Sequence, residues 1–174
     1  LIAEVTAMAP TLEAQLTQAV ATADAVAGSS LTTLWAASAT ASSEFGNPDW
    51  SAMQATGAPN TAECADLATA WASAAAAGID WLQLEYAQAV IPLEIHIYQT
   101  YNPGAIVKVE VIDETNQIHS VYTASPQAAE TCPYTLVIQI TGIVSRVSTV
   151  IIHLDQSSHT GWNEIDAVAL VGKP

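Results

Sequence analysis

The chain has 174 residues, of which 17 are acidic and 3 are Lys or Arg, so its formal net charge at pH 7 is −14. This charge would repel nucleic acid and anionic membrane surfaces, which excludes proteins that bind through a basic patch. The length suits one domain with an appendage, with a core large enough to be stable alone.

The charged fraction is 11%, against about 25% in ordinary globular domains. Ala, Ser and Thr fill the rest of the surface. Two explanations stay open: a secreted protein with a neutral, hydroxyl-rich exterior, or an exterior covered by other subunits, where charges are depleted. No run of 18 or more apolar residues lacks a charge, so we expect no membrane span. Because the chain begins at Leu1 without a signal peptide, we expect a processed or trimmed product.

Residues 1–30 are predicted to form an apolar α-helical segment that precedes a domain over 31–174. Apolar residues recur there every three or four positions, Pro10 suits a first helical turn, and Gly28 supplies the stop. Such a stripe needs an apolar partner, either in this chain or in another copy; a loosely folded Ala-rich leader or linker is the alternative. The residues expected to mediate oligomerisation are Leu1, Val5, Met8, Leu12, Leu16 and Val20, and the stripe continues through Ala19, Ala23 and Val26.

From Leu34 onward the apolar period is two, which predicts short β-strands. With no helical period between them, they predict an all-β fold, an antiparallel β-sandwich. Alternation points Ile95 and Ile97 inward and places His96 and His153 on the solvent face. Trp35, Trp71 and Trp81 fall in strands and are expected to pack in the core or against the ends of strands. The predicted strands cover residues 35–43, 69–73, 81–86, 93–100, 106–112, 118–123, 134–140, 147–154 and 165–171.

The two cysteines, Cys64 and Cys132, lie 68 positions apart and belong to no CxxC or metal-ligand cluster. In an exported protein they would form one disulfide, which the acidic, Lys-poor, Thr-rich composition favours. Two buried free thiols in a cytosolic protein are the alternative.

Three segments carry a family resemblance: 69–73 (TAWAS), 97–104 (IYQTYNPG) and 161–172 (GWNEIDAVALVG). Over about residues 35–172 the chain resembles the galactose-binding-like (discoidin-type) jelly-roll domains, including a subset found in bacterial envelope proteins. The resemblance implies a jelly roll that binds or assembles and does not catalyse. It also implies a structural Ca²⁺ held by an early loop and the last strand, here by Asp66, Thr69, Glu164 and Asp166. The alternative is that Asp66 and Glu164 cap or solvate loops.

Nothing in the sequence favours catalysis or zinc. GxSxG, HExxH, P-loop and GxGxxG motifs are all lacking. His153, Asp155 and Ser157 could be combined into a catalytic set, but in so hydroxyl-rich a chain the signal is weak. His153 and His159 straddle a loop without zinc-site spacing and are expected to be solvated.

Loop aromatics beside amide and carboxylate groups suit sugar rings, which stack on flat faces while their hydroxyls form hydrogen bonds. These candidate ligand-binding residues are Asn47, Asp49, Trp50, Tyr101, Asn102 and Trp162. Two functions follow. The first is an extracellular structural module that self-associates, or joins other envelope proteins, in a cell-surface assembly or filament through the 1–30 helix and the charge-poor sandwich. The alternative is a carbohydrate-binding, lectin-like adhesion module.

Overall fold

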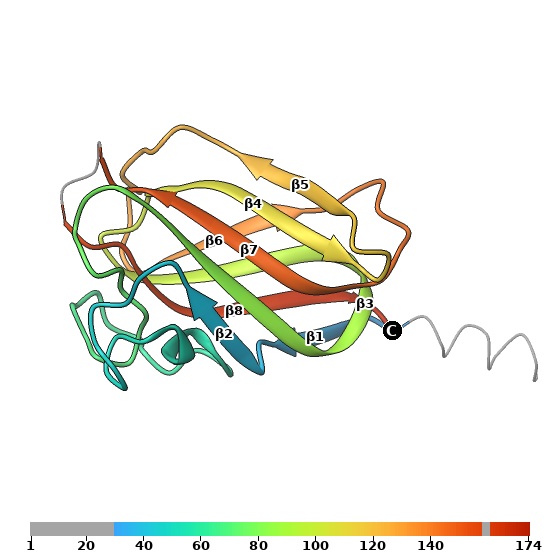
Figure 1. Cartoon of the computed structure of the whole chain (residues 1–174), viewed down its shortest axis with the longest axis horizontal. Coiled ribbons are helices and arrows are strands. Elements are labelled where there is room, and N and C mark those ends of the chain that lie inside the picture. Colours follow the sequence, from blue (N-terminus) through green and yellow to red (C-terminus); the bar gives the residue numbers. More distant parts are fainter. Residues whose placement is uncertain (1–29, 158–160) are drawn as a thin grey trace, which may run out of the picture. The chain divides into compact units, whose positions relative to one another are not determined.

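The structure is a computed structural model that describes residues 30–157 and 161–174 (Figure 1). The predicted N-terminal helix, its apolar stripe and the oligomerisation residues lie outside the described residues, as does His159. The described elements are β1 (Thr32–Trp35), β2 (Ser38–Ala41), the 3₁₀ turn η1 (Ala52–Ala55), β3 (Ile79–Tyr101), β4 (Ile106–Asp113), β5 (Ile118–Thr123), β6 (Tyr134–Gln139), β7 (Val147–Asp155) and β8 (Glu164–Lys173).

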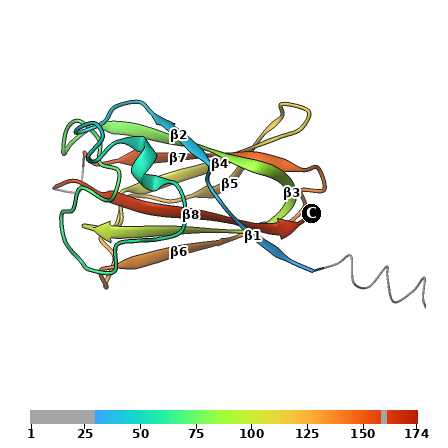
Figure 2. The ribbon, with the colours of Figure 1, turned by 90° about the horizontal axis from the view of Figure 1, so that it is seen from below.

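The strands form two antiparallel layers, as Figure 2 shows. The first sheet has the order β1-β8-β3-β6, and the second has the order β2-β3-β7-β4-β5. The predicted all-β antiparallel sandwich is therefore confirmed. Over the part of the chain that the structure describes, no helix has the length and apolarity needed to cross a membrane.

Strand β3 belongs to both sheets. Its first part, 79–85, pairs with β2 and β7, and its last part, 91–101, pairs with β8 and β6. Between the two parts the register shifts, and the chain bends past the exposed Ala87 and Gln88. Pro92, which has no N–H to donate, lies beside a further shift in the pairing with β8. The sequence predicted two separate strands here, over 81–86 and 93–100, whereas the structure joins them in one bent strand.

Two other predicted strands were wrong. Residues 35–43 are divided between β1, which pairs with β8, and β2, which pairs with β3 in the other sheet. Residues 69–73 form only one bridge, from Trp71 to Ile165. This segment instead buries Ala70, Trp71 and Ala72 in a long loop. The prediction for 118–123 matches β5, and those for β4, β6, β7 and β8 agree to within one or two residues at each end.

The core lies between the sheets and consists of alternate residues of facing strands, such as Leu82, Leu84, Ile95, Ile97 and Val150. Strand β8 differs because its residues from Glu164 to Gly172 are all buried. It lies between β1 and β3, and segment 42–78 supplies further contacts through η1 and Trp71. Burial on both faces explains the continuous apolar run of this strand.

The three strand tryptophans have different surroundings. Trp71 is fully buried, as predicted. Trp35 is half-buried and packs on Tyr98, with 5.7 Å between ring centroids. Trp81 remains 38% exposed near the start of β3, so the core position, one of the two predicted for it, was wrong. The alternation was correct, but the inward positions of this segment belong to Leu82 and Leu84.

The two strand histidines lie on the outer faces as predicted, each paired with a carboxylate. The Nε2 atom of His96 is 2.6 Å from Glu94 Oε2, and that of His153 is 2.8 Å from Glu110 Oε2. About a quarter of each histidine side chain remains exposed, 26% and 28% respectively.

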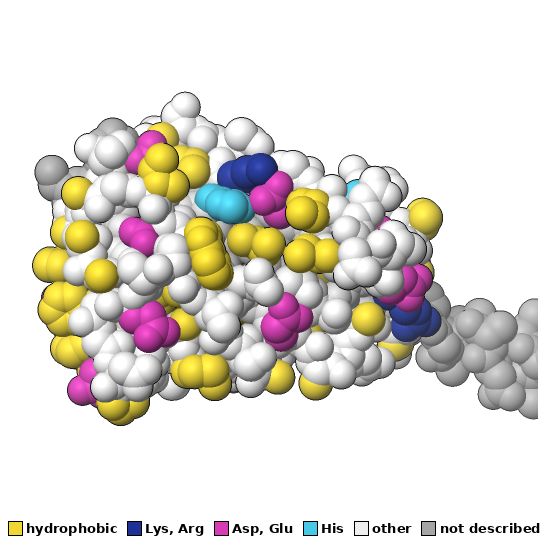
Figure 3. Space-filling view, in the orientation of Figure 1, with side chains coloured by type: hydrophobic (Ala, Val, Ile, Leu, Met, Phe, Trp, Pro, Cys, Tyr) yellow, Lys and Arg dark blue, Asp and Glu magenta, His cyan; other side chains and the backbone are white. Residues whose placement is uncertain are grey.

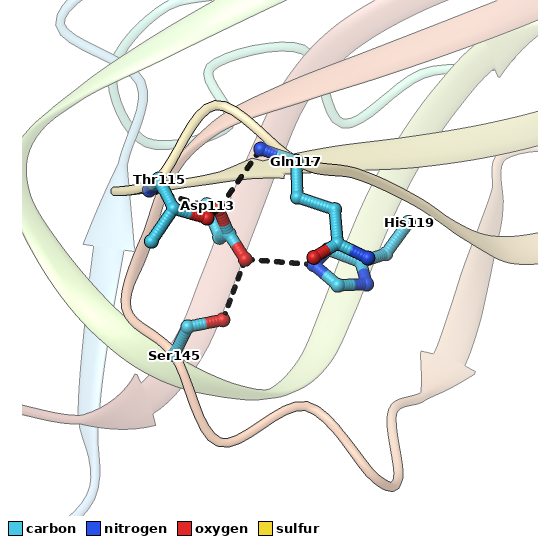
Figure 4. A network of polar contacts seen from close by, with 5 residues as sticks. All are labelled: Asp113, Thr115, Gln117, His119 and Ser145. Carbon is cyan, nitrogen blue, oxygen red and sulfur yellow. Dashed lines mark hydrogen bonds and ion pairs between the residues drawn. The ribbon is translucent and has the colours of Figure 1, made fainter.

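At one end of the sandwich the β4–β5 turn meets the segment between β6 and β7; we call this the hairpin end. Asp113 is buried there and organises the turn (Figure 4). Its Oδ1 accepts hydrogen bonds from the backbone N–H and hydroxyl of Thr115 and from the N–H of Gln117. Its Oδ2 accepts the Ser145 hydroxyl and contacts His119 Nε2, both at 2.8 Å. One carboxylate thus ties two connecting segments together.

Candidate functional site

The opposite end of the sandwich is built from the long segment 42–78, the 102–105 turn and the residues just before β8 (Figure 1). We call this the loop end. The ends of β3 and the start of β8 position it, since Tyr101 pairs with Glu164. Loops on a rigid scaffold are where binding residues concentrate.

An aromatic cluster lies at the loop end and comprises Phe45, Trp50 and Trp162; we call it the aromatic patch. The Phe45 ring is 5.3 Å from each indole, in edge-to-face geometry, and Phe45 is 50% exposed. A hollow of about 20 Å³ lies among the patch, Asp66, Ala72 and Glu164. The patch is therefore an exposed, ordered apolar surface next to carboxyl groups.

Hydrogen bonds to neighbouring groups hold both indole rings of the patch in place. Trp50 Nε1 donates to Asp66 Oδ1 at 3.1 Å, and Trp162 Nε1 donates to the carbonyl of Ser73 at 2.9 Å. The backbone of Trp50 has φ 54°, in the left-handed region that bulky residues seldom adopt. Two backbone hydrogen bonds hold that conformation: the N–H of Trp50 donates to the carbonyl of Ala68, and the N–H of Ala72 donates to the carbonyl of Trp50. Strain of this kind gathers at binding sites.

Two carboxyl groups of β8 face the same long segment. Glu164 is 1% exposed, and its Oε2 accepts the N–H of Leu67 at 3.3 Å. Burial, together with the neighbouring Asp66, raises the pKa of Glu164 to about 8. Asp166 is also 1% exposed and accepts the N–H groups of Asn60 and Thr61 at its Oδ2, at 3.1 and 3.3 Å. Burial raises the pKa of Asp166 as well.

These contacts bear on the predicted calcium site. Glu164 and Asp66 do come together, while Thr69 contacts the hydroxyl of Thr61 at 2.5 Å. A calcium ion needs several oxygen ligands, but an oxygen of Glu164 and one of Asp166 face backbone N–H groups. In residues 30–157 and 161–174, no group of three or more His, Cys, Asp or Glu is arranged to hold a metal ion. The donor set in this arrangement does not fit calcium, and calcium binding stays a prediction.

The other predicted ligand residues also lie at the loop end. Asn47 and Asp49 are exposed on the turn between Phe45 and Trp50. Tyr101 and Asn102 end β3, where Asn163 Nδ2 donates to the Asn102 carbonyl and to Gln99 Oε1. The structure therefore brings Trp50 and Trp162 together through Phe45. The sequence analysis missed Phe45, although its place next to the Gly46-Asn47-Pro48-Asp49 turn was a usable signal.

The predicted disulfide between Cys64 and Cys132 is confirmed. It links the long segment of the loop end to the residues just before β6. The disulfide therefore connects the long loop to the body of the sandwich, as the sequence predicted.

The combination of His153, Asp155 and Ser157 does not form a catalytic set. His153 bonds to Glu110 across β7 and β4, and Asp155 accepts both the N–H and the hydroxyl of Ser157. A wider hollow of about 430 Å³ lies outside the aromatic patch, under the segment joining β5 to β6. Its lining includes Gln99, Tyr122 and Tyr134.

Residues 27–174 match the family described as pappalysin-1, SD scarf domain, C-terminal, and the chain belongs to this family. No curated protein matches the chain in sequence.

Solved structures share the galactose-binding-like jelly-roll fold at low identity. The chitosan-binding module 1 of a chitosanase/glucanase from Paenibacillus sp. IK-5 has a TM-score of 0.60 and 17% identity, with 76% of this chain and 92% of that chain covered. The CBM32 of AlyQ, in complex with 4,5-unsaturated mannuronic acid, has a TM-score of 0.57 and 15% identity, with 80% and 97% covered. Allantoicase from Saccharomyces cerevisiae has a TM-score of 0.59 and 14% identity, with 82% and 43% covered. The shared fold therefore occurs in binding modules and in an enzyme.

Proposed function

We propose that this SD scarf domain is a non-catalytic carbohydrate-binding module that acts outside the cell. The observation that carries the proposal is the aromatic patch, in which Phe45 lies exposed between the anchored indoles of Trp50 and Trp162. Flat aromatic faces stack on the C–H faces of sugar rings, and adjacent polar groups bond to the hydroxyls. The fold that the chain shares with a chitosan-binding module and with a CBM32 supports this ligand class.

The electrostatics narrow the class of sugar. The chain carries a net charge of −14, and Asp66 and Glu164 line the hollow beneath the patch. Acidic polysaccharides would be repelled at long range, whereas neutral and amino sugars would not. We therefore expect chitosan and neutral oligosaccharides to bind better than polygalacturonate.

The test is calorimetric titration of the whole chain with chitosan, chitohexaose and polygalacturonate, after a glycan-array screen. Phe45→Ala and Trp50→Ala should each weaken binding about tenfold or more, since truncating an aromatic anchor commonly costs above 1 kcal/mol. Trp35→Ala is the matched control, because Trp35 packs on Tyr98 away from the patch. Circular dichroism of each variant separates lost binding from lost folding. Absence of binding to every glycan on the array, or equal binding by folded patch variants, would overturn the proposal.

Self-association through residues 1–30 has a separate test, because that segment lies outside the described residues. Sedimentation of the full chain beside a chain lacking residues 1–30 should show an oligomer only for the former. A full-length chain that sediments as a monomer at high concentration would contradict self-association through residues 1–30.

A further inference from the structure

The outer face of the second sheet carries an ordered set of side chains that the loop end does not use. Cross-strand register places Trp81 beside His153, and His153 beside Lys108. The next row on the same face contains Gln83, Ile151 and Glu110, and the one after it contains Glu85, Thr149 and Ile112. We call these nine residues the Trp81 face. Figure 3 views the molecule from this side and shows histidine, basic and acidic side chains beside hydrophobic ones.

Trp81 is placed on this face in an unusual way. Its side chain is 38% exposed. Within residues 30–157 and 161–174, its indole N–H has no hydrogen-bond partner, as is also the case for Trp35, whereas those of Trp50, Trp71 and Trp162 all have one. Trp is enriched at binding surfaces because its apolar ring and its N–H donor can both contact a ligand.

The charged groups around Trp81 are paired within the protein. Glu110 contacts Lys108 Nζ at 2.5 Å and His153 Nε2 at 2.8 Å. Hydrogen bonds from Lys108 and then His153 lower the pKa of Glu110. Glu85 accepts Gln83 Nε2 at 2.9 Å and the Thr149 hydroxyl at 2.8 Å. A carboxylate has about four lone-pair sites, so both groups keep free acceptors in a fixed orientation.

We propose that the Trp81 face is a second sugar-binding surface, which takes a neutral, unbranched oligosaccharide lying across β3, β7 and β4. It shares its ligand class with the proposed function but none of its residues. The ion pair between Glu110 and Lys108 leaves no unpaired charge in that part of the face. The free lone pairs of Glu110 and Glu85 suit hydroxyl donors. The face is a sheet surface, and three strands span about 10 Å, so an extended chain fits better than a single sugar held in a pocket.

The experiment is ¹⁵N NMR of the full chain, titrated with cellohexaose, xylohexaose, mannohexaose, laminarihexaose and the fully N-acetylated, neutral form of chitohexaose in turn. We expect at least one of them to shift the Trp81 indole N–H and the amides of 81–85 and 149–153. The shifts should persist in the Phe45→Ala/Trp50→Ala double variant, which separates this surface from the aromatic patch. Trp81→Ala should weaken that binding about tenfold or more, and Trp35→Ala should leave it unchanged. Because the ligand is neutral, added salt should change the affinity little.

Three results would overturn the proposal. One is the absence of shifts on the Trp81 face with all five hexasaccharides. Another is shifts that disappear in the double variant, since the binding would then belong to the loop end. The third is a wild-type chain that self-associates in sedimentation while Trp81→Ala does not, with no sugar shifts, which would make the face a protein interface.

Discussion

Two carboxylic acids at opposite ends of the sandwich are almost equally inaccessible and yet behave in opposite ways. Asp113 at the hairpin end is 6% exposed, and Glu164 at the loop end is 1% exposed. Hydrogen bonds from Thr115 and His119 hold the pKa of Asp113 well below its usual range. Burial raises the pKa of Glu164 to about 8.

The difference lies in the partners, since loss of solvent raises the pKa of both groups. Asp113 has five hydrogen-bonding partner atoms within its own turn and the neighbouring segment, which favour its charged form. Glu164 accepts the N–H of Leu67 and lies beside a second carboxyl group, Asp66, which favours its protonated form. A carboxylate that its hydrogen-bond donors hold in the charged form is typical of a structural anchor, whereas a buried carboxyl group with a raised pKa is typical of a functional site. The hairpin end therefore supplies its buried carboxylate with enough donors to keep it charged, whereas the loop end places two carboxyl groups side by side.

The largest expected effect comes from removing the covalent tie of the loop end. Replacing Cys64 and Cys132 together by Ala should lower the free energy of unfolding by about 4 kcal/mol, the loop-closure value for a loop of this length. Guanidinium denaturation measures this difference. Limited proteolysis should show new cleavage within 47–66 and none near Asp113. Equal denaturation midpoints for the variant and the wild type would contradict the dependence of the loop end on the disulfide.

Breaking the anchor of the hairpin end should have the next largest effect. Asp113→Ala leaves the donors of Thr115, Gln117 and Ser145 without their acceptor, so Tm should fall by several degrees at neutral pH. Ser145→Ala removes one of these bonds and serves as the milder control.

The depressed pKa of Asp113 also fixes a pH dependence. The unfolded-state pKa lies near 3.9, so the contribution of Asp113 is fully present above that pH and is lost as pH falls through the folded-state pKa. A plot of Tm against pH across the acidic range should be flatter for Asp113→Asn than for the wild type. Curves of the same slope would mean that Asp113 is not an acid-sensitive anchor.

The two ends also differ in how far the sequence predicted them. Strand β5 and the inward positions of β3 followed from alternation, because a period of two states which residues share a face. The period alone does not indicate which of the two faces is buried, and for that reason Trp81 could be assigned to the core although Leu82 and Leu84 occupy it. Phe45 was missed because the two residues it packs on, Trp50 and Trp162, lie in a turn and just before β8, and only folding brings Trp162 next to it. Asp66 and Glu164 were predicted as a pair through a family resemblance, but the backbone N–H groups that occupy Glu164 and Asp166 depend on the path of a long loop.

At neutral pH the smallest effect on stability is expected from Glu164→Gln, which keeps the shape of a protonated carboxyl group. Because the folded-state pKa of Glu164 lies near 8 and the unfolded-state value near 4.5, the folded state holds a proton that the unfolded state has released between these values. Wild-type stability should therefore fall as pH rises from about 4.5 to about 8 through this group, the opposite sign to Asp113. The variant should lose this slope while keeping the acid dependence that Asp113 imposes. Thermal unfolding in EDTA measures the slopes, and a parallel series in calcium tests the predicted ion. Because the donor set at the loop end does not fit calcium, we expect the two series to coincide. Parallel curves for the two proteins in EDTA would show that Glu164 is ionised in the folded protein at neutral pH, and the contrast between the two ends would then rest on geometry alone.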